Sequence, residues 1–98
     1  MARRSHRYFF NMNFLTILET IAKVCGISTG DILSKSKKQP IATARQLSYW
    51  FARRGRTYEE LATLFNRHYS NGIHAVKTIN NRLDVGDYMT TNLIFFFF

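Results

Sequence analysis

Residues 57–79, TYEELATLFNRHYSNGIHAVKTI, contain the pattern that decides the fold. The hydroxyl of Thr57 and the carboxylate of Glu60, three residues later, have the spacing of a capping box, in which each side chain accepts a hydrogen bond from the other residue's backbone N–H. A helix is therefore predicted to begin at Thr57. Helical spacing assigns three apolar residues to its inward face: Leu61, Leu64 and Phe65.

A second helix is predicted across a connection of only a few residues, Asn66 to Tyr69. Asparagine suits such a turn because it tolerates the left-handed backbone conformation. The helix runs from about Ser70 to Asp84 and repeats apolar residues at helical spacing: Ile73, Val76, Ile79 and Leu83. Two helices joined so tightly are typical of a helix-turn-helix, whose second helix enters a DNA major groove. An ordinary αα-hairpin in a small bundle has the same periodicity, so both interpretations stay open at this point.

The chain before residue 57 also predicts helices. One runs from about Asn13 to Cys25 and ends at Gly26, which supplies the left-handed stop. A short helix follows Ser28, which has capping-box spacing with Asp31. The residues predicted to face inward on the first of these helices are Leu15, Leu18, Ile21, Ala22 and Cys25.

A further helix is predicted from about Pro40 to Arg54, because proline suits the first turn and Gly55 supplies a stop. Its inward residues are predicted to be Ala44, Leu47, Trp50 and Phe51. The polar segment before it, residues 35–39, is predicted to be a basic loop. Strand patterns find little support, so we expect an all-α domain of about five helices, with a helix-turn-helix and a preceding basic loop.

The chain divides into three parts: a basic and aromatic N-terminal arm (1–12), the helical domain (13–84) and a tail with an apolar end (85–98). The arginines of the arm suit the phosphate backbone of DNA, although a disordered start is the alternative. The tail ends in six consecutive apolar residues, Leu93 to Phe98. Such a run favours aggregation unless it packs on this domain or on a partner, and a homodimer sealed by the tail is one hypothesis.

Charge is distributed unevenly along the chain. Its 98 residues contain fourteen Lys plus Arg and six Asp plus Glu, a formal net charge of +8. The stretch between Asp31 and Glu59 contains no acid and seven basic residues: Lys35, Lys37, Lys38, Arg45, Arg53, Arg54 and Arg56. A stretch of one sign favours a polyanion such as nucleic acid as partner. The alternatives are solubility alone and a protein-interaction module whose basic face binds an acidic partner.

Several classes of protein are excluded by composition. The longest apolar run is far below the roughly 20 residues of a membrane span, and no signal peptide is evident, so we expect a cytoplasmic, nucleoid-associated protein. A single cysteine, Cys25, supports neither a disulfide nor a metal cluster. His68 and His74 fall on roughly opposite faces of a helix and make a poor metal pair. We therefore expect no metal and, without a phosphate loop or a nucleophile–base pattern, no enzyme activity and no nucleotide cofactor.

Four segments have the order and spacing of a known family: ISTGDILSK (27–35), ARQ (44–46), TYEELA (57–62) and RHYSNGIHAVK (67–77). On these segments the chain resembles the C-terminal DNA-binding domain of the bacterial replication initiator DnaA. The resemblance implies a helix-turn-helix with a basic loop that binds double-stranded DNA. Nothing in the chain resembles the ATPase portion of the initiator, so we expect a freestanding module acting in replication or transcription control.

The resemblance also implies which residues contact DNA. The family's basic loop inserts an arginine into the minor groove, and the matching position here is Gln39, so Lys37 or Lys38 is expected to substitute. At the tip of the recognition helix the family reads Asp-His-Ser/Thr-Thr, whereas this chain reads His68-Tyr69-Ser70-Asn71. The remaining candidates are the basic residues Arg45, Arg67 and Lys77.

The departures from the family fall where bases are read, whereas the phosphate-directed positions are better preserved. We therefore expect duplex binding with a changed or relaxed sequence preference. Asn71 is a candidate for bidentate contact with adenine, and Tyr69 for contact with a thymine methyl or, alternatively, for packing across the turn. Gly72 replaces a branched apolar residue and is interpreted as permitting close approach to a phosphate. His74 matches a histidine of the family, either as a packed residue or as a DNA contact.

Overall fold

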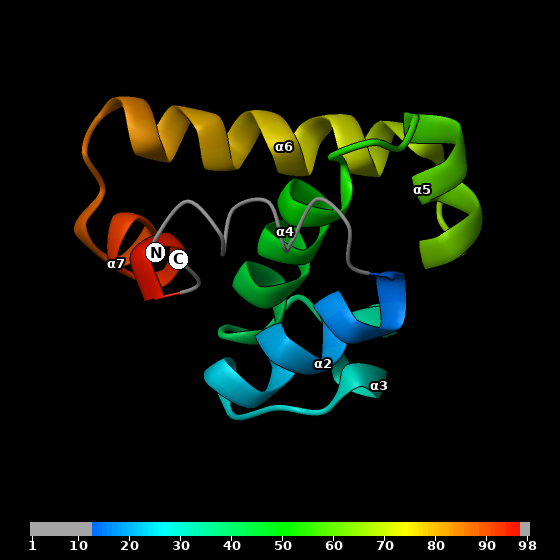
Figure 1. Ribbon diagram of the computed structural model, residues 1–98, viewed down its shortest axis with the longest axis horizontal. Coiled ribbons are helices and arrows are strands. Elements are labelled where there is room, and N and C mark those ends of the chain that lie inside the picture. The colour runs from blue at the N-terminus through cyan, green and yellow to red at the C-terminus, as the bar shows by residue number, and fades with distance from the viewer. Residues whose placement is uncertain (1–12, 97–98) are drawn as a thin grey trace.

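A computed structural model describes residues 13–96, and the predicted arm at residues 1–12 lies outside the described residues. The described part is helical without strands, and its helices are α2 (Phe14–Cys25), α3 (Thr29–Leu33), α4 (Ile41–Ala52), α5 (Tyr58–Phe65), α6 (Tyr69–Asp84) and α7 (Tyr88–Phe96). Helix α4 lies at the centre, with α6 along one side and α2 and α3 along the other (Figure 1). Helices α5 and α7 lie at opposite ends of α6. The predicted all-α class is confirmed.

Short-range capping explains where these helices begin and end. Thr57 and Glu60 form the predicted capping box, with Glu60 N donating to Thr57 Oγ1 over 3.1 Å and Thr57 N to Glu60 Oε1 over 2.7 Å. Ser28 and Asp31 form the same motif at the start of α3. Asn66 ends α5 in the left-handed conformation with φ at 53°. The helix-turn-helix boundaries therefore follow from residues three or four positions apart.

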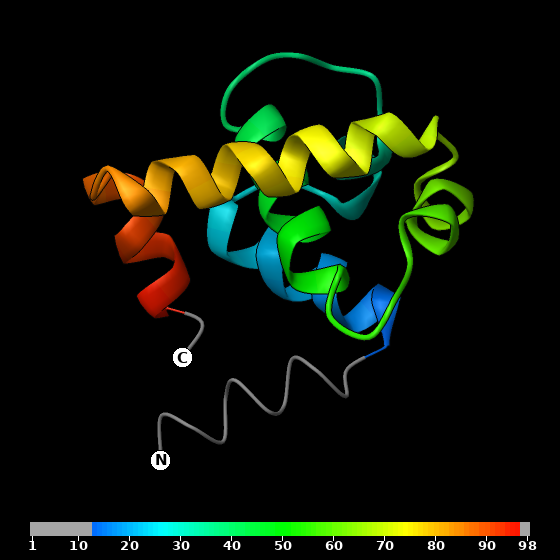
Figure 2. The ribbon, with the colours of Figure 1, turned by 90° about the horizontal axis from the view of Figure 1, so that it is seen from above.

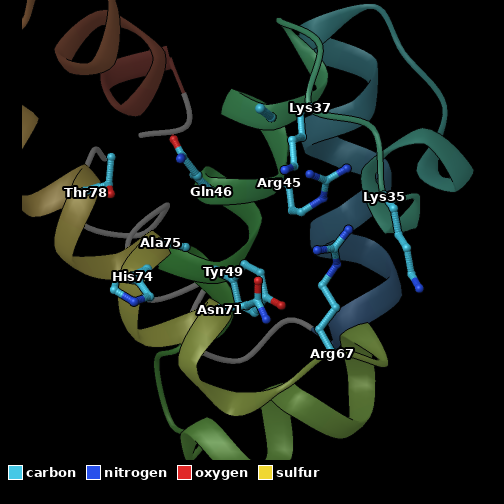
Figure 3. A pocket seen from close by; sticks show the side chains of 11 residues that line it. Lys35, Lys37, Arg45, Gln46, Tyr49, Arg67, Asn71, His74, Ala75 and Thr78 are labelled. Atoms are coloured by element: carbon cyan, nitrogen blue, oxygen red, sulfur yellow. The ribbon is translucent and has the colours of Figure 1, made fainter.

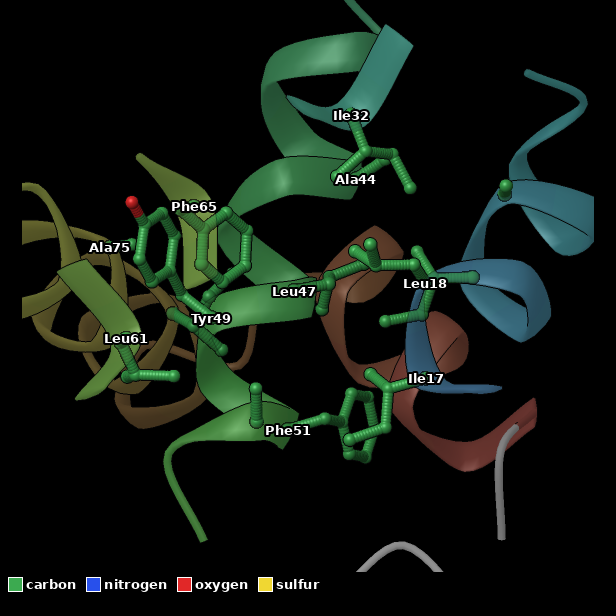
Figure 4. Packing of buried hydrophobic residues seen from close by; sticks show 14 of the residues in the cluster. Ile17, Leu18, Ile32, Ala44, Leu47, Tyr49, Phe51, Leu61, Phe65 and Ala75 are labelled. Atoms are coloured by element: carbon green, nitrogen blue, oxygen red, sulfur yellow. The ribbon is translucent and has the colours of Figure 1, made fainter. Parts of the chain in front are cut away.

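The core lies where α4 meets α2, α5 and α6 (Figure 4). The rings of Tyr49 and Phe65 stack at 3.8 Å between centroids, and Phe14 packs edge-on against Phe65 at 4.9 Å. Cys25 is half-buried against this core, and burial raises the pKa of its thiol. The thiol is therefore kept in its less reactive protonated form, as expected for a packed cysteine.

Three predicted inward residues prove to be exposed. Leu15 is 57% exposed because it shares a solvent face of α2 with Glu19, while Ile17 takes the inward position. Leu64 is exposed because α5 buries only its Leu61 and Phe65. Ile73 is also exposed, since the buried stripe of α6 consists of Gly72, Ala75 and Ile79. Hydrophobic periodicity identified these helices correctly but misjudged how each is rotated against its neighbours.

Gly72 contacts aromatic rings rather than open solvent. A Cβ atom at this position would lie 3.3 Å from Tyr49 Cδ1 and Cε1 and 3.3 Å from Tyr58 Cδ1. The missing side chain thus lets the backbone of α6 pack closely on α4 and α5. The interpretation of Gly72 as a point of close approach to a phosphate is wrong, because its Cα faces the core.

Residues 85–98 were predicted to form a tail with an apolar end; within them Tyr88–Phe96 forms α7, which packs on α6, and residues 97–98 lie outside the described residues. Asp87 caps this helix, with its Oδ2 accepting from Thr90 N over 2.9 Å. Ile94, within the apolar end, is buried in the same core cluster as α2 and α4. Part of the apolar run is therefore covered by this domain, and the homodimer stays a prediction.

Candidate nucleic-acid interface

The turn between α5 and α6 presents the first turn of α6 to solvent. His68 caps α6, with its Nδ1 accepting from Ser70 N over 3.2 Å and lying 2.9 Å from Ser70 Oγ. Asn71 Nδ2 donates to His68 O over 3.1 Å. Hydrogen bonds from its own side chains therefore hold the tip predicted to read bases, His68 to Asn71, in one conformation without a ligand.

Tyr69 is the most prominent side chain of this tip. It is 48% exposed, and its ring lies against the ring of His68 with centroids 4.5 Å apart. The ring therefore packs in part on His68 of the turn, and both interpretations of Tyr69 stay predictions. About half of the Tyr69 side-chain surface remains open to an external contact.

The basic loop before α4 is braced by serine hydroxyls. Ser36 N donates to Ser34 Oγ, and Lys38 N donates to Ser36 Oγ, each over 3.2 Å. Lys35, Lys37 and Lys38 are all exposed on this loop. Seen from above, the loop at residues 35–39 arches outward on one side of α6 (Figure 2).

Arg45 and Arg67 have structural partners that the sequence did not indicate. Arg45 is only 9% exposed, and its Nε donates to Ile32 O over 2.8 Å. Arg67 Nη2 donates to Ser34 O over 2.7 Å, which ties the turn before α6 to the start of the basic loop. Burial, and then the positive charge of Arg67, lowers the pKa of Arg45. Arg45 therefore holds α3 against α4, a structural role that was not part of its prediction as a DNA contact.

A pocket of about 270 Å³ lies between this loop, α4 and α6 (Figure 3). Figure 3 shows the guanidinium groups of Arg45 and Arg67 next to each other at its edge. Four cationic side chains line the pocket, and none of its described lining residues is acidic. The lining residues are Lys35, Lys37, Ala42, Arg45, Gln46, Tyr49, Arg67, Asn71, His74, Ala75 and Thr78. Such a pocket attracts anions.

The pocket brings together only part of the predicted DNA-binding set, namely Lys37, Arg45, Arg67 and Asn71. The others lie outside it on the tip, on the loop or on the exposed face of α6, and they are Lys38, His68, Tyr69, Ser70 and Lys77. Sequence reasoning missed Gln46, Tyr49 and Thr78, and left His74 undecided. Helical spacing was the available signal, because Asn71, His74, Ala75 and Thr78 share one face of α6.

The acid-free stretch from Lys35 to Arg56 does not form one continuous surface. Its lysines precede α4, whereas Arg53, Arg54 and Arg56 follow it, about 18 Å away along a twelve-residue helix. Arg53 Nη1 donates to Arg56 O over 2.7 Å, and its guanidinium carbon lies 4.5 Å from the Tyr58 ring centroid. The three late arginines therefore belong to the α4–α5 connection, and among the basic residues of this stretch only Lys35, Lys37 and Arg45 line the pocket.

The sequence of residues 15–79 matches the family described as the bacterial DnaA protein helix-turn-helix. The chain belongs to this DnaA family. Among curated proteins, it is 29% identical over 73 residues to the chromosomal replication initiator protein DnaA of Pseudothermotoga lettingae, covering 72% of this chain and 16% of that protein. It is 34% identical over 65 residues to the DnaA of Kosmotoga olearia, covering 64% of this chain and 14% of that protein. The DnaA-type domain thus spans about one sixth of these relatives.

No solved structure matches this DnaA-type chain significantly. Its family comprises DNA-binding helix-turn-helix domains, which is the class that the α5–α6 geometry indicates. Between residues 13 and 96, no helix is long and apolar enough to cross a membrane.

Proposed function

We propose that this domain binds double-stranded DNA with the N-terminal turn of α6 in the major groove and the loop at residues 35–38 on the adjacent backbone or minor groove. The supporting observation is the acid-free pocket, which has the lysine loop on one side and the start of α6 on the other. Phosphate groups on both sides of a groove are spaced to meet two such elements at once.

The sequence preference of this binding is proposed to differ from that of the family's usual box. His68 and Tyr69 occupy positions where the family has aspartate and histidine, and Tyr69 offers an exposed aromatic surface rather than an imidazole. One N–H of the Asn71 amide donates to His68 O, which leaves the side-chain carbonyl oxygen and the second N–H available for another contact. These are the two groups that bidentate contact with adenine needs.

The process proposed for the domain is the control of replication or transcription by occupation of chromosomal sites. Nucleotide binding forms no part of the proposal, because the family match concerns the helix-turn-helix. A protein-interaction module with an acidic partner is the competing function, since a basic pocket also attracts carboxylates.

Titration of the full chain with random and box-containing duplexes across a range of salt concentrations tests the proposal. With about five or six neutralised phosphates, log affinity should fall against log salt with a slope of roughly −4 to −6. No duplex binding at low salt refutes the proposed function and favours the protein-interaction module. Equal affinity for all duplexes would leave binding intact but refute a sequence preference.

A further inference from the structure

Two residues that line the pocket carry a buried polar atom with no hydrogen-bond partner among the described residues: the hydroxyl of Tyr49 and Oε1 of Gln46. Tyr49 is 2% exposed, lines the pocket from α4, and its hydroxyl is unpaired. A buried hydroxyl without a partner costs free energy, because it has lost the hydrogen bonds that water provided. Such a group in a folded protein therefore calls for an absent partner.

The ring of Tyr49 is closely packed against its neighbours. One side of the ring stacks on Phe65 at 3.8 Å, and the backbone of Gly72 approaches the ring closely. A larger residue at position 72 would occupy this space, since a Cβ there would already lie 3.3 Å from two ring carbons. The close packing of Tyr49 on Gly72 therefore fixes the position of the Tyr49 hydroxyl at the pocket.

The charges around this hydroxyl indicate what kind of partner is missing. Burial raises the pKa of Tyr49, while the nearby guanidinium groups of Arg67 and Arg45 act in the opposite direction. The phenol therefore remains protonated at neutral pH and has a hydrogen to donate. Guanidinium groups have no acceptor to offer it, and the carbonyls of Ile32 and Ser34 already accept from these arginines. Gln46 Oε1 is an acceptor in the same pocket, but it is itself without a partner, so it does not accept from Tyr49. An acceptor that two positive charges would also attract is an anionic oxygen.

We propose that the Tyr49 hydroxyl donates a hydrogen bond to a phosphate oxygen of the DNA backbone seated in this pocket, between Arg45 and Arg67. The inference rests on the proposed DNA binding and adds a residue to it. The pocket, about 270 Å³, has room for a phosphate group, since a water molecule occupies about 30 Å³ in the liquid. A contact of this kind positions the domain on the duplex without reading its sequence.

The substitution Tyr49→Phe tests the proposal, because it removes the hydroxyl and keeps the ring against Phe65 and Gly72. We expect about a tenfold loss of duplex affinity, which corresponds to about 1.4 kcal/mol. The loss should be equal for random and box-containing duplexes. The slope of log affinity against log salt should stay unchanged, because a neutral donor releases no counterion. The midpoint of urea unfolding should be no lower than that of the wild type, because an unpaired buried hydroxyl has been removed.

Tyr88→Phe is the matched control, since Tyr88 is 77% exposed on α7 and takes no part in the pocket. It should bind DNA as the wild type does. The proposal is overturned if Tyr49→Phe binds within twofold of the wild type. It is also overturned if the variant has a flatter salt slope or a lower unfolding midpoint, because the hydroxyl would then act through the arginines or the fold. Failure of the wild type to bind any duplex at low salt is a separate result that refutes the proposed function.

Discussion

Replacing Gly72 by alanine should destabilise this domain, although the same change in most helices is stabilising. Alanine is favoured over glycine within a helix by about 0.8–1.0 kcal/mol. Here the new Cβ would lie 3.3 Å from three ring carbons, inside the optimal carbon–carbon separation of about 3.5–4.0 Å. The Tyr49 ring is stacked on Phe65 and has little freedom to move, so overpacking should cost about 1–3 kcal/mol. We expect a net loss of about 1 kcal/mol in the free energy of unfolding.

A second glycine provides the matched control. Gly30 lies in α3, where an added Cβ would meet only Ser28 Oγ at 3.6 Å, an ordinary contact distance. Gly30→Ala should therefore stabilise the protein by up to about 1 kcal/mol, because the gain in helix propensity meets no strain. The two variants should shift the unfolding free energy in opposite directions.

A double-mutant cycle tests the physical cause. In a Tyr49→Leu background two of the three opposing ring carbons are absent and only Tyr58 Cδ1 remains, so Gly72→Ala should cost less than it does in the wild type. The expected coupling free energy is about 1–2 kcal/mol. The relevant measurement is urea unfolding followed by helical circular dichroism. A change of 1 kcal/mol should also shift the melting temperature of a domain of this size by roughly 4–8 °C. Stabilisation by Gly72→Ala equal to that by Gly30→Ala, or a cycle without coupling, would refute the packing argument.

Four further perturbations probe the interface and the fold. Lys37→Ala should weaken binding to all duplexes alike and reduce the slope of log affinity against log salt by about one. The control is Lys23→Ala on the remote helix α2. A changed preference between duplexes would contradict a phosphate contact by Lys37. Asn71→Ala should instead alter the ratio of affinities for box-containing and random duplexes, and equal losses on both would remove its base-reading role. Arg45→Ala should lower the free energy of unfolding by about 1–3 kcal/mol, because it leaves a carbonyl of α3 unpaired; a fully stable variant that only loses DNA would reverse this assignment. Hydrogen bonds from the side chain and backbone of Thr90 lower the pKa of Asp87. The carboxylate therefore stabilises the fold at pH values above the ordinary pKa of about 3.9, and this stabilisation is lost as the pH falls through the lowered pKa. Asp87→Ala should consequently reduce the midpoint of urea unfolding at neutral pH and have a smaller effect in acid. An effect of equal size at both pH values would contradict a stabilising role for the charge of the Asp87 carboxylate.

The helix-turn-helix could be predicted well because its determinants are local. The capping box of Thr57 and Glu60 and the left-handed Asn66 depend on residues a few positions apart, so their chemistry is visible in the printed sequence. The tip from His68 to Asn71 could be located for the same reason. The helix α7 was missed because residues 85–98 read as a tail with an apolar end.

The roles of individual side chains within the site were harder to predict. Arg45 meets Ile32 across 13 positions and Arg67 meets Ser34 across 33. In the sequence, a basic side chain that donates a hydrogen bond to a distant carbonyl looks the same as one that is available to bind a phosphate. The same limit made the acid-free stretch look continuous, although α4 separates its two halves.

The sequence alone determined the helical class, the helix-turn-helix and the excess of positive charge, because periodicity, capping and net charge are properties of neighbouring residues or of the whole composition. Tertiary structure decided which faces are covered, which arginines are committed to the fold and that Tyr49, beside Gly72, places an unpaired hydroxyl in the pocket. These features depend on the rotation and distance of helices that are remote in the chain. That arrangement is set by the close packing of the whole core rather than by any single segment.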